Sequence, residues 1–154
     1  MLLCVLCVLG SLAMGACQQT PTDPVAEVRA LLDDLVEAVE ARTPQVILSH
    51  VAFEFRTDDG LTYPDVQSIV LEYLIPEETL GARLESAEVT VGDAPDEVRS
   101  EARVRFARGA RLSRRSLPPP PGSVVYAFEI WFRKIEGEWQ AIRGRYQRAE
   151  EDAG

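Results

Sequence analysis

Apolar residues recur at helical spacing in the first part of the chain. Over residues 24–42 they return every three or four positions, while acidic side chains fill much of the remainder. Asp23 directly before Pro24 is typical of a helix start, because aspartate caps free backbone N–H groups and proline suits the first turn. The pattern predicts a long amphipathic helix over 24–42 and shorter helices over 45–51 and 64–74.

Further along the chain the apolar spacing changes from helical to alternating. A short strand is predicted at 53–56, where apolar and charged residues alternate. After residue 80 the same alternation predicts one hairpin from strands over 84–91 and 98–106. A second hairpin is predicted from strands over 123–134 and 139–146. Helices followed by hairpin-connected strands indicate an α+β fold, with the helices on one face of an antiparallel sheet.

The strand over 123–134 has the strongest alternation. Its even positions carry Tyr126, Phe128, Ile130 and Phe132. We expect this more apolar face to meet the helices. The odd positions include Glu129 and Trp131, which we therefore expect on the opposite face of the sheet, in a dimer contact.

The end of this strand and the start of the next carry a recognisable pattern. It reads Tyr126-x-Phe128-x-Ile130-x-Phe132-Arg133-Lys134-x-x-Gly137-Glu138-Trp139. Together with the three helices and Phe53-Glu54-Phe55, it resembles the NTF2-like superfamily, also called the SnoaL-like or cystatin-like cone fold. The resemblance covers Val25 to Arg148 and implies N-terminal helices packed on a curved antiparallel sheet around a cone-shaped cavity. Members of the superfamily include isomerases, dehydratases, ligand binders and adaptors, so the fold does not choose between catalysis and binding.

The N-terminus carries a different signal. Residues 1–16 contain no charged side chain and are mostly apolar, which is typical of a secretory signal. The residues Met14-Gly15-Ala16-Cys17 resemble the end of a bacterial lipoprotein signal, in which small residues precede a cysteine that becomes lipid-modified. This resemblance implies a membrane anchor through lipid on Cys17 and a periplasm-facing place in the cell envelope, at the outer membrane.

These signals divide the chain into four parts. We assign 1–16 to the lipoprotein signal peptide, 17–23 to a polar tether, 24–149 to the NTF2-like domain and 150–154 to a polar tail.

Two residues are candidates for proton transfer. His50 is the only histidine, and its imidazole beside Glu54 or Asp58 would suit a general base. The alternative is structural, because His50 closes a short helix where donor side chains commonly satisfy carbonyl groups. Glu129 would accept a proton if its face turned toward a dry cavity, since desolvation raises a carboxyl pKa.

Other chemistry finds little support in the sequence. All three cysteines, Cys4, Cys7 and Cys17, fall in the leader or at its end, and one histidine makes a poor metal set, so we expect no metal site. No phosphate-binding or nucleophile motif is present, and we expect no cofactor. The candidates for a ligand-binding surface are aromatic: Tyr63, Tyr73, Tyr126, Phe128 and Tyr146.

Charge is distributed unevenly along the chain. The net charge is −9, yet residues 23–97 are strongly acidic and residues 98–154 are basic, with an arginine-rich stretch from Arg99 to Arg115. One interpretation is contact with an anionic surface or an acidic partner. The other is a solvated strand face whose arginines neutralise the acidic helices. Nucleic acid is not expected as a partner of an exported acidic protein.

The leading functional hypothesis is a lipid-anchored bacterial envelope protein whose NTF2-like domain binds a small apolar ligand or a protein partner without catalysis. One alternative is a small-molecule enzyme of the isomerase or dehydratase type that uses His50 or Glu129 as proton acceptor. The other alternative is a homodimeric assembly adaptor.

Overall fold

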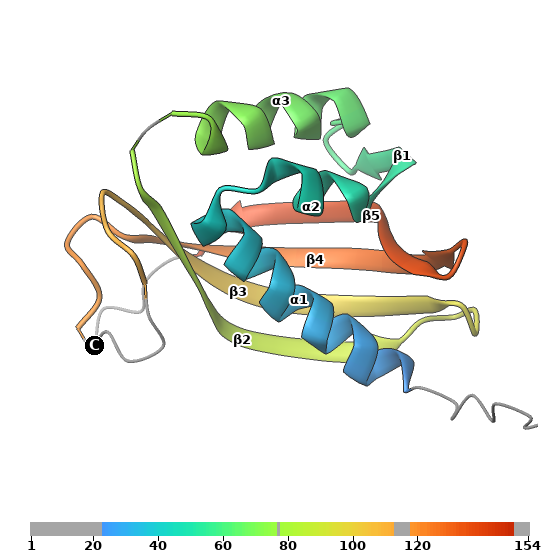
Figure 1. Cartoon of the computed structure of the whole chain (residues 1–154). Coiled ribbons are helices and arrows are strands. Elements are labelled where there is room, and N and C mark those ends of the chain that lie inside the picture. The colour runs from blue at the N-terminus through green and yellow to red at the C-terminus, as the bar shows by residue number, and fades with distance from the viewer. Residues whose placement is uncertain (1–22, 77, 113–117, 150–154) are drawn as a thin grey trace, which may run out of the picture.

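The computed structural model describes residues 23–76, 78–112 and 118–149 (Figure 1). In chain order the elements are α1 (Pro24–Ala41), α2 (Pro44–Ser49), β1 (Val51–Thr57), α3 (Tyr63–Leu74), β2 (Leu80–Val91), β3 (Glu97–Arg108), β4 (Val124–Ile135) and β5 (Glu138–Arg148). All predicted helices and strands are present. Strands β1, β2, β3 and β5 are longer than predicted by a few residues, β4 has its predicted length one residue further along, and α2 ends at Ser49 rather than at residue 51. Within these described residues, no helix combines the length and apolar character needed to span a membrane.

The ends of α1 show why the chain turns where it does. The Asp23 carboxylate accepts a hydrogen bond from the Val25 backbone N–H at 3.1 Å, as the sequence predicts for a helix cap. At the other end Arg42 adopts a left-handed conformation with φ 58°. Its guanidinium donates to the carbonyl groups of Leu74 and Ile75, at 3.1 and 2.8 Å, and so joins the end of α1 to the end of α3.

The five strands form one sheet in the order β1-β5-β4-β3-β2. Strands β2 to β5 pair antiparallel, as predicted, but β1 pairs parallel with β5. The sheet is therefore mixed rather than wholly antiparallel. Alternating apolar residues predict a strand but do not report the direction of its neighbour, and β1 and β5 are too far apart in the sequence for a hairpin to decide it.

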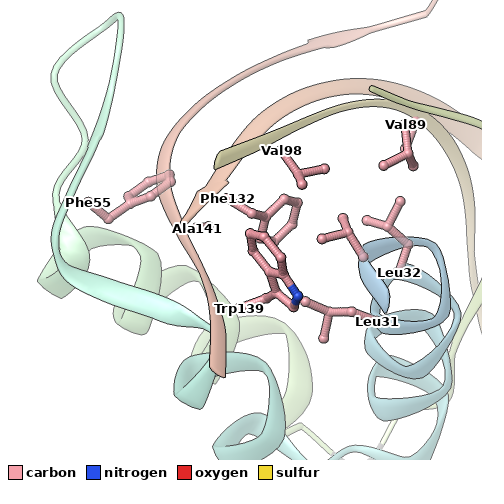
Figure 2. Packing of buried hydrophobic residues seen from close by; sticks show 10 residues of the cluster. Leu31, Leu32, Phe55, Val89, Val98, Phe132, Trp139 and Ala141 are labelled. Carbon is pink, nitrogen blue, oxygen red and sulfur yellow. The ribbon is translucent and has the colours of Figure 1, made fainter. Parts of the chain in front are cut away.

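One face of the sheet, called the inner face below, packs against α1 (Figure 2). Figure 2 shows Phe132 and Trp139 packed beside Leu31 and Leu32 of α1. The buried residues of this core are Val28, Leu31, Leu32, Phe55, Val89, Val98, Ala102, Phe132, Trp139 and Ala141. The apolar side of β4 thus meets the helices, as its alternation predicts.

A polar contact fixes the start of α1 on this core. The indole Nε1 of Trp139 donates to the Glu27 carboxylate at 2.5 Å, and Lys134 Nζ lies 2.9 Å from the same oxygen. Trp139 is buried, so its N–H requires an acceptor within the protein. The first turn of α1 is therefore held against the hairpin that joins β4 to β5.

Two phenylalanines provide a direct test of this packing. Phe132 is 1% exposed, whereas Phe53 on β1 is 82% exposed. We expect Phe132→Ala to lower the free energy of unfolding by about 3–5 kcal/mol, because it removes core contacts and leaves a cavity. The matched change Phe53→Ala is expected to stay within about 0.5 kcal/mol. Urea unfolding followed by circular dichroism measures both, and equal losses would contradict the difference in burial between the two side chains.

Candidate functional site

The inner face carries a row of aromatic side chains beyond the buried core. Phe106 on β3, Tyr126 and Phe128 on β4, and Tyr146 on β5 have ring centroids 6.1–6.4 Å apart. The strand register produces the row, because Phe128 lies directly opposite Tyr146 and alternate residues of β4 point to one side. We call these four residues the aromatic row.

The aromatic row differs from the core in its exposure. Tyr146 is 47% exposed and the other three side chains are partly exposed, in contrast to buried Phe132. Two large side chains of α3 are incompletely buried as well: Ile69 is 39% and Tyr73 45% exposed. Apolar and aromatic side chains of the sheet and of α3 therefore remain accessible.

Tyr73 lies beside the end of β3. Its ring is 5.1 Å from the guanidinium carbon of Arg108, at the end of the strand that carries Phe106. Tyr63 lies elsewhere, with its ring 5.8 Å from that of Phe53. Of the five predicted ligand-site residues, the structure thus brings together Tyr126, Phe128 and Tyr146.

Phe106 belongs to the aromatic row but was missing from the predicted site residues. Its alternation with Ala102 and Val104 was visible in the sequence. Its position beside Tyr126 was not, because it depends on the register between β3 and β4, which a long connection separates. Strands joined by such a connection have no turn that fixes their register in advance.

Glu129 lies on the opposite face of the sheet, called the outer face below. Its carboxylate accepts hydrogen bonds from Arg145 on β5 and from Arg99 Nε on β3, the latter at 2.6 Å. The hydrogen bond from Arg145, and next that from Arg99, holds the pKa of Glu129 below its usual range despite partial burial. A cavity-facing proton acceptor would require the opposite shift.

Trp131 lies on the same outer face, beside the arginines that bind Glu129. The guanidinium carbons of Arg99, Arg143 and Arg145 lie 5.8, 4.7 and 5.4 Å from its ring centroid. Flat contact between guanidinium groups and an indole is favourable, and it covers apolar surface on an otherwise polar face.

The arginines of the basic half pair with acids of the sheet. Arg105 contacts Glu85, and Arg133 contacts Glu97, each at 2.6 Å. The sequence interpretation that these arginines neutralise the acidic helices is therefore corrected. Cross-strand neighbours are only about 5 Å apart, so an acid on the adjacent strand is the nearest partner. Lys134 does contact an acid of a helix, Glu27 of α1.

His50 lies at the C-terminal end of α2 and contacts β5. Its Nδ1 is 2.9 Å from the carbonyl oxygen of Trp139, and because a carbonyl only accepts, Nδ1 must carry the proton and donate. Its own carbonyl accepts from the Ala141 backbone N–H at 2.8 Å. Asp58, one candidate partner, instead binds Arg143 at 2.9 Å. These contacts hold α2 and β5 together.

The outer face is hollowed where β2, β3, β4 and β5 lie side by side. The hollow measures about 820 Å³, and small side chains such as Ser86 and Ala127 are part of its lining. Its charged lining residues are Glu88, Arg99, Glu101, Arg103, Glu129 and Arg145. In the part of the chain that the structure describes, no three histidine, cysteine or acidic side chains are grouped to hold a metal ion. We call this feature the outer hollow.

Comparisons with solved structures establish the fold. An NTF2-like protein of unknown function from Pseudomonas putida KT2440 matches with a TM-score of 0.64 and 14% identity, over 84% of this chain and 89% of that one. An NTF2-like protein from Cytophaga hutchinsonii matches with a TM-score of 0.61 and 10% identity, over 83% of this chain and all (100%) of that one. The chain therefore has the α+β NTF2-like fold, with N-terminal helices on a mixed, mostly antiparallel sheet.

A third similar structure is longer. Bd1075 from Bdellovibrio bacteriovorus matches with a TM-score of 0.63 and 10% identity, over 82% of this chain but only 41% of its own length. No family model matches the chain, and no curated protein matches its sequence. At these identities the likeness concerns the fold and carries no activity across.

The Glu129 network predicts a particular response to acid. Because the folded-state pKa lies below the ordinary value of 4.5, the ionised group stabilises the fold above that value, and this contribution is lost as the pH falls through the lowered folded-state pKa. We expect Glu129→Gln to lower the free energy of unfolding by about 1 kcal/mol at neutral pH. The difference from the unchanged protein should shrink below about pH 4.

Glu88→Gln is the matched control, since Glu88 lines the same outer hollow and has no ion-pair partner among the described residues. Its stability should follow that of the unchanged protein at every pH. Denaturant unfolding at several pH values measures both variants. A Glu129→Gln deficit that stays constant into acid would contradict the assigned pKa direction.

Proposed function

We propose that this chain is a lipid-anchored envelope protein whose NTF2-like domain binds a small apolar ligand against the aromatic row, without catalysis. The observation that supports the binding role most is the accessibility of the aromatic row on the inner face. Phe106, Tyr126, Phe128 and Tyr146 pack against one another, yet none is buried as the core residues are.

The chemistry of the aromatic row suits an apolar guest. Partly exposed rings gain about 25 cal/mol for each Å² of apolar surface that a ligand removes from water. Tyr126 and Tyr146 add hydroxyl groups, which orient a guest that carries a polar atom. This composition favours a molecule that is mostly apolar with few polar atoms.

The positions of the two candidate proton acceptors favour binding over proton transfer at the aromatic row. Glu129 faces away from the aromatic row and is held ionised by Arg99 and Arg145. His50 donates its Nδ1 proton to the Trp139 carbonyl, which leaves a free lone pair on Nε2, but this contact lies at the start of β5, whereas Tyr146 of the aromatic row lies near the end of that strand. A general base must lie within reach of its substrate.

Ligand occupancy is tested by native mass spectrometry of the full chain extracted gently from bacterial membranes. We expect a retained non-covalent mass of a few hundred daltons, distinct from the detergent. Phe128→Ala should release it, because loss of one ring contact of about 2 kcal/mol weakens binding about thirtyfold.

Phe53→Ala is the matched control for this experiment, since it removes an exposed phenylalanine outside the aromatic row. It should retain the mass in full, as should Glu129→Gln. An empty protein, or a mass that survives Phe128→Ala, would contradict the proposed site.

The membrane anchor rests on residues that lie outside the described part of the chain, and it is tested independently. We expect metabolic labelling with radioactive palmitate to mark the protein and Cys17→Ser to abolish the label, because Cys17 is the proposed acceptor. Cys7→Ser is the matched control and should keep the label. Equal labelling of both variants, or none in the unchanged protein, would contradict a lipid on Cys17.

A further inference from the structure

Arg148, the last residue of β5, lies on the inner face beside the aromatic row. The strand register sets it directly opposite Tyr126 of β4, and residues opposite each other on neighbouring strands project from the same side of a sheet. Arg148 also follows Tyr146 by two residues, which places both side chains on one face. A guanidinium group therefore adjoins two rings of the aromatic row.

Arg148 has no partner within the described residues. Its side chain is exposed and makes no hydrogen bond or ion pair there. The register places Val104, Tyr126 and Arg148 side by side across three strands, and neither neighbour carries a charge. By contrast, Arg99 and Arg145 of the outer face contact an acid of the neighbouring strand. The positive charge of Arg148 is thus left unbalanced at the edge of an aromatic surface.

Arg108 is a second base on this face, but it is already engaged. It follows Phe106 by two residues at the end of β3. Its guanidinium carbon lies 5.1 Å from the centre of the Tyr73 ring, and its Nη1 lies 3.6 Å from the Glu78 carboxylate. Of these two arginines, Arg148 therefore keeps its donors available to a ligand.

We propose that the ligand of the aromatic row is an apolar acid whose carboxylate binds Arg148. This inference rests on the proposed binding role and adds the chemical class of the ligand. The guanidinium fork matches the two oxygens of a carboxylate, and its single charge balances that of the carboxylate. A phosphate monoester carries about 1.5 to 2 negative charges at neutral pH and would need a second available base.

The position of Arg148 suits such a two-part ligand. Side chains opposite each other on adjacent strands have Cβ atoms about 4.5–5.5 Å apart, so a carboxylate on Arg148 leaves the attached apolar chain beside Tyr126. The chain can then extend over Phe128 and Phe106, whose ring centroids lie 6.4 Å apart. Because Arg148 is exposed, the carboxylate stays in contact with water and no unpaired charge is buried.

Three probes with the same apolar chain and different head groups test the proposal. Dodecanoate, methyl dodecanoate and dodecylamine are each added to the full chain in a non-ionic detergent, and the bound fraction is measured by native mass spectrometry. We expect dodecanoate to bind about tenfold more tightly than the uncharged ester, because one charge-assisted contact separates them. Dodecylamine is expected to bind most weakly, since its ammonium group meets a like charge.

Variants of Arg148 assign the difference to this residue. Arg148→Gln is expected to lower the affinity for dodecanoate about tenfold, to that of the ester, and to leave the affinity for the ester unchanged. Arg148→Glu should reverse the order, so that dodecylamine binds more tightly than dodecanoate.

Arg103→Gln is the matched control, because Arg103 is also exposed and without a partner within the described residues but lies on the outer face. It should leave the affinities for all three probes unchanged, and circular dichroism checks that every variant is folded.

The outcomes separate the head-group contact from the binding role itself. Equal binding of dodecanoate and its ester, both lost in Phe128→Ala, would overturn the inference and leave apolar binding at the aromatic row intact. Dodecanoate binding that survives Arg148→Gln would also overturn it. Failure of all three probes to bind would overturn both the inference and the proposed function.

Discussion

Burial of the apolar stripe of α1 against one face of the sheet is the contact on which the rest of the structure depends. Val28, Leu31 and Leu32 meet Val98 and Phe132, and these residues together exclude water from the part of the inner face that α1 covers. Because side chains of a strand alternate, this contact also decides that the odd positions of β4 face outward. A shift of register by one residue would bury Glu129 and expose Phe132, so the core enforces the division of both faces.

The same contact explains why the inner face is only partly closed. α1 lies across β2 and β3 (Figure 1). The aromatic row lies on β3, β4 and β5, beyond the residues that α1 buries. Arg42 joins the ends of α1 and α3, yet the side chains of α3 stay largely accessible. Partial covering of an aromatic surface is the physical basis of the binding role proposed here.

Local sequence patterns predict much of this fold but little of the candidate site. Periodicity predicts the helices and strands, and Asp23 predicts where α1 begins, because caps and alternation act between near neighbours. The parallel pairing of β1 and the place of Phe106 beside Tyr126 depend on strands distant in sequence. The acids that pair with the arginines were missed for the same reason. Glu85 reaches Arg105 only after β2 and β3 have paired.

The outer face shows how a sheet can be both highly charged and well ordered. Arginines of β3 and β5 flank Glu129 of β4, so Glu129 gains two partners at once, and the flanking arginines shield Trp131. Individual exposed ion pairs contribute little, but cross-strand sets share the entropy cost of holding long side chains in place. Arg103 and Glu88 differ from these paired residues. They carry opposite charges, lie on adjacent strands and have no side-chain partner within the described residues. Pairing within the sheet thus accounts for most of the charge on the outer face, and the alternation of side chains leaves the aromatic row on the inner face.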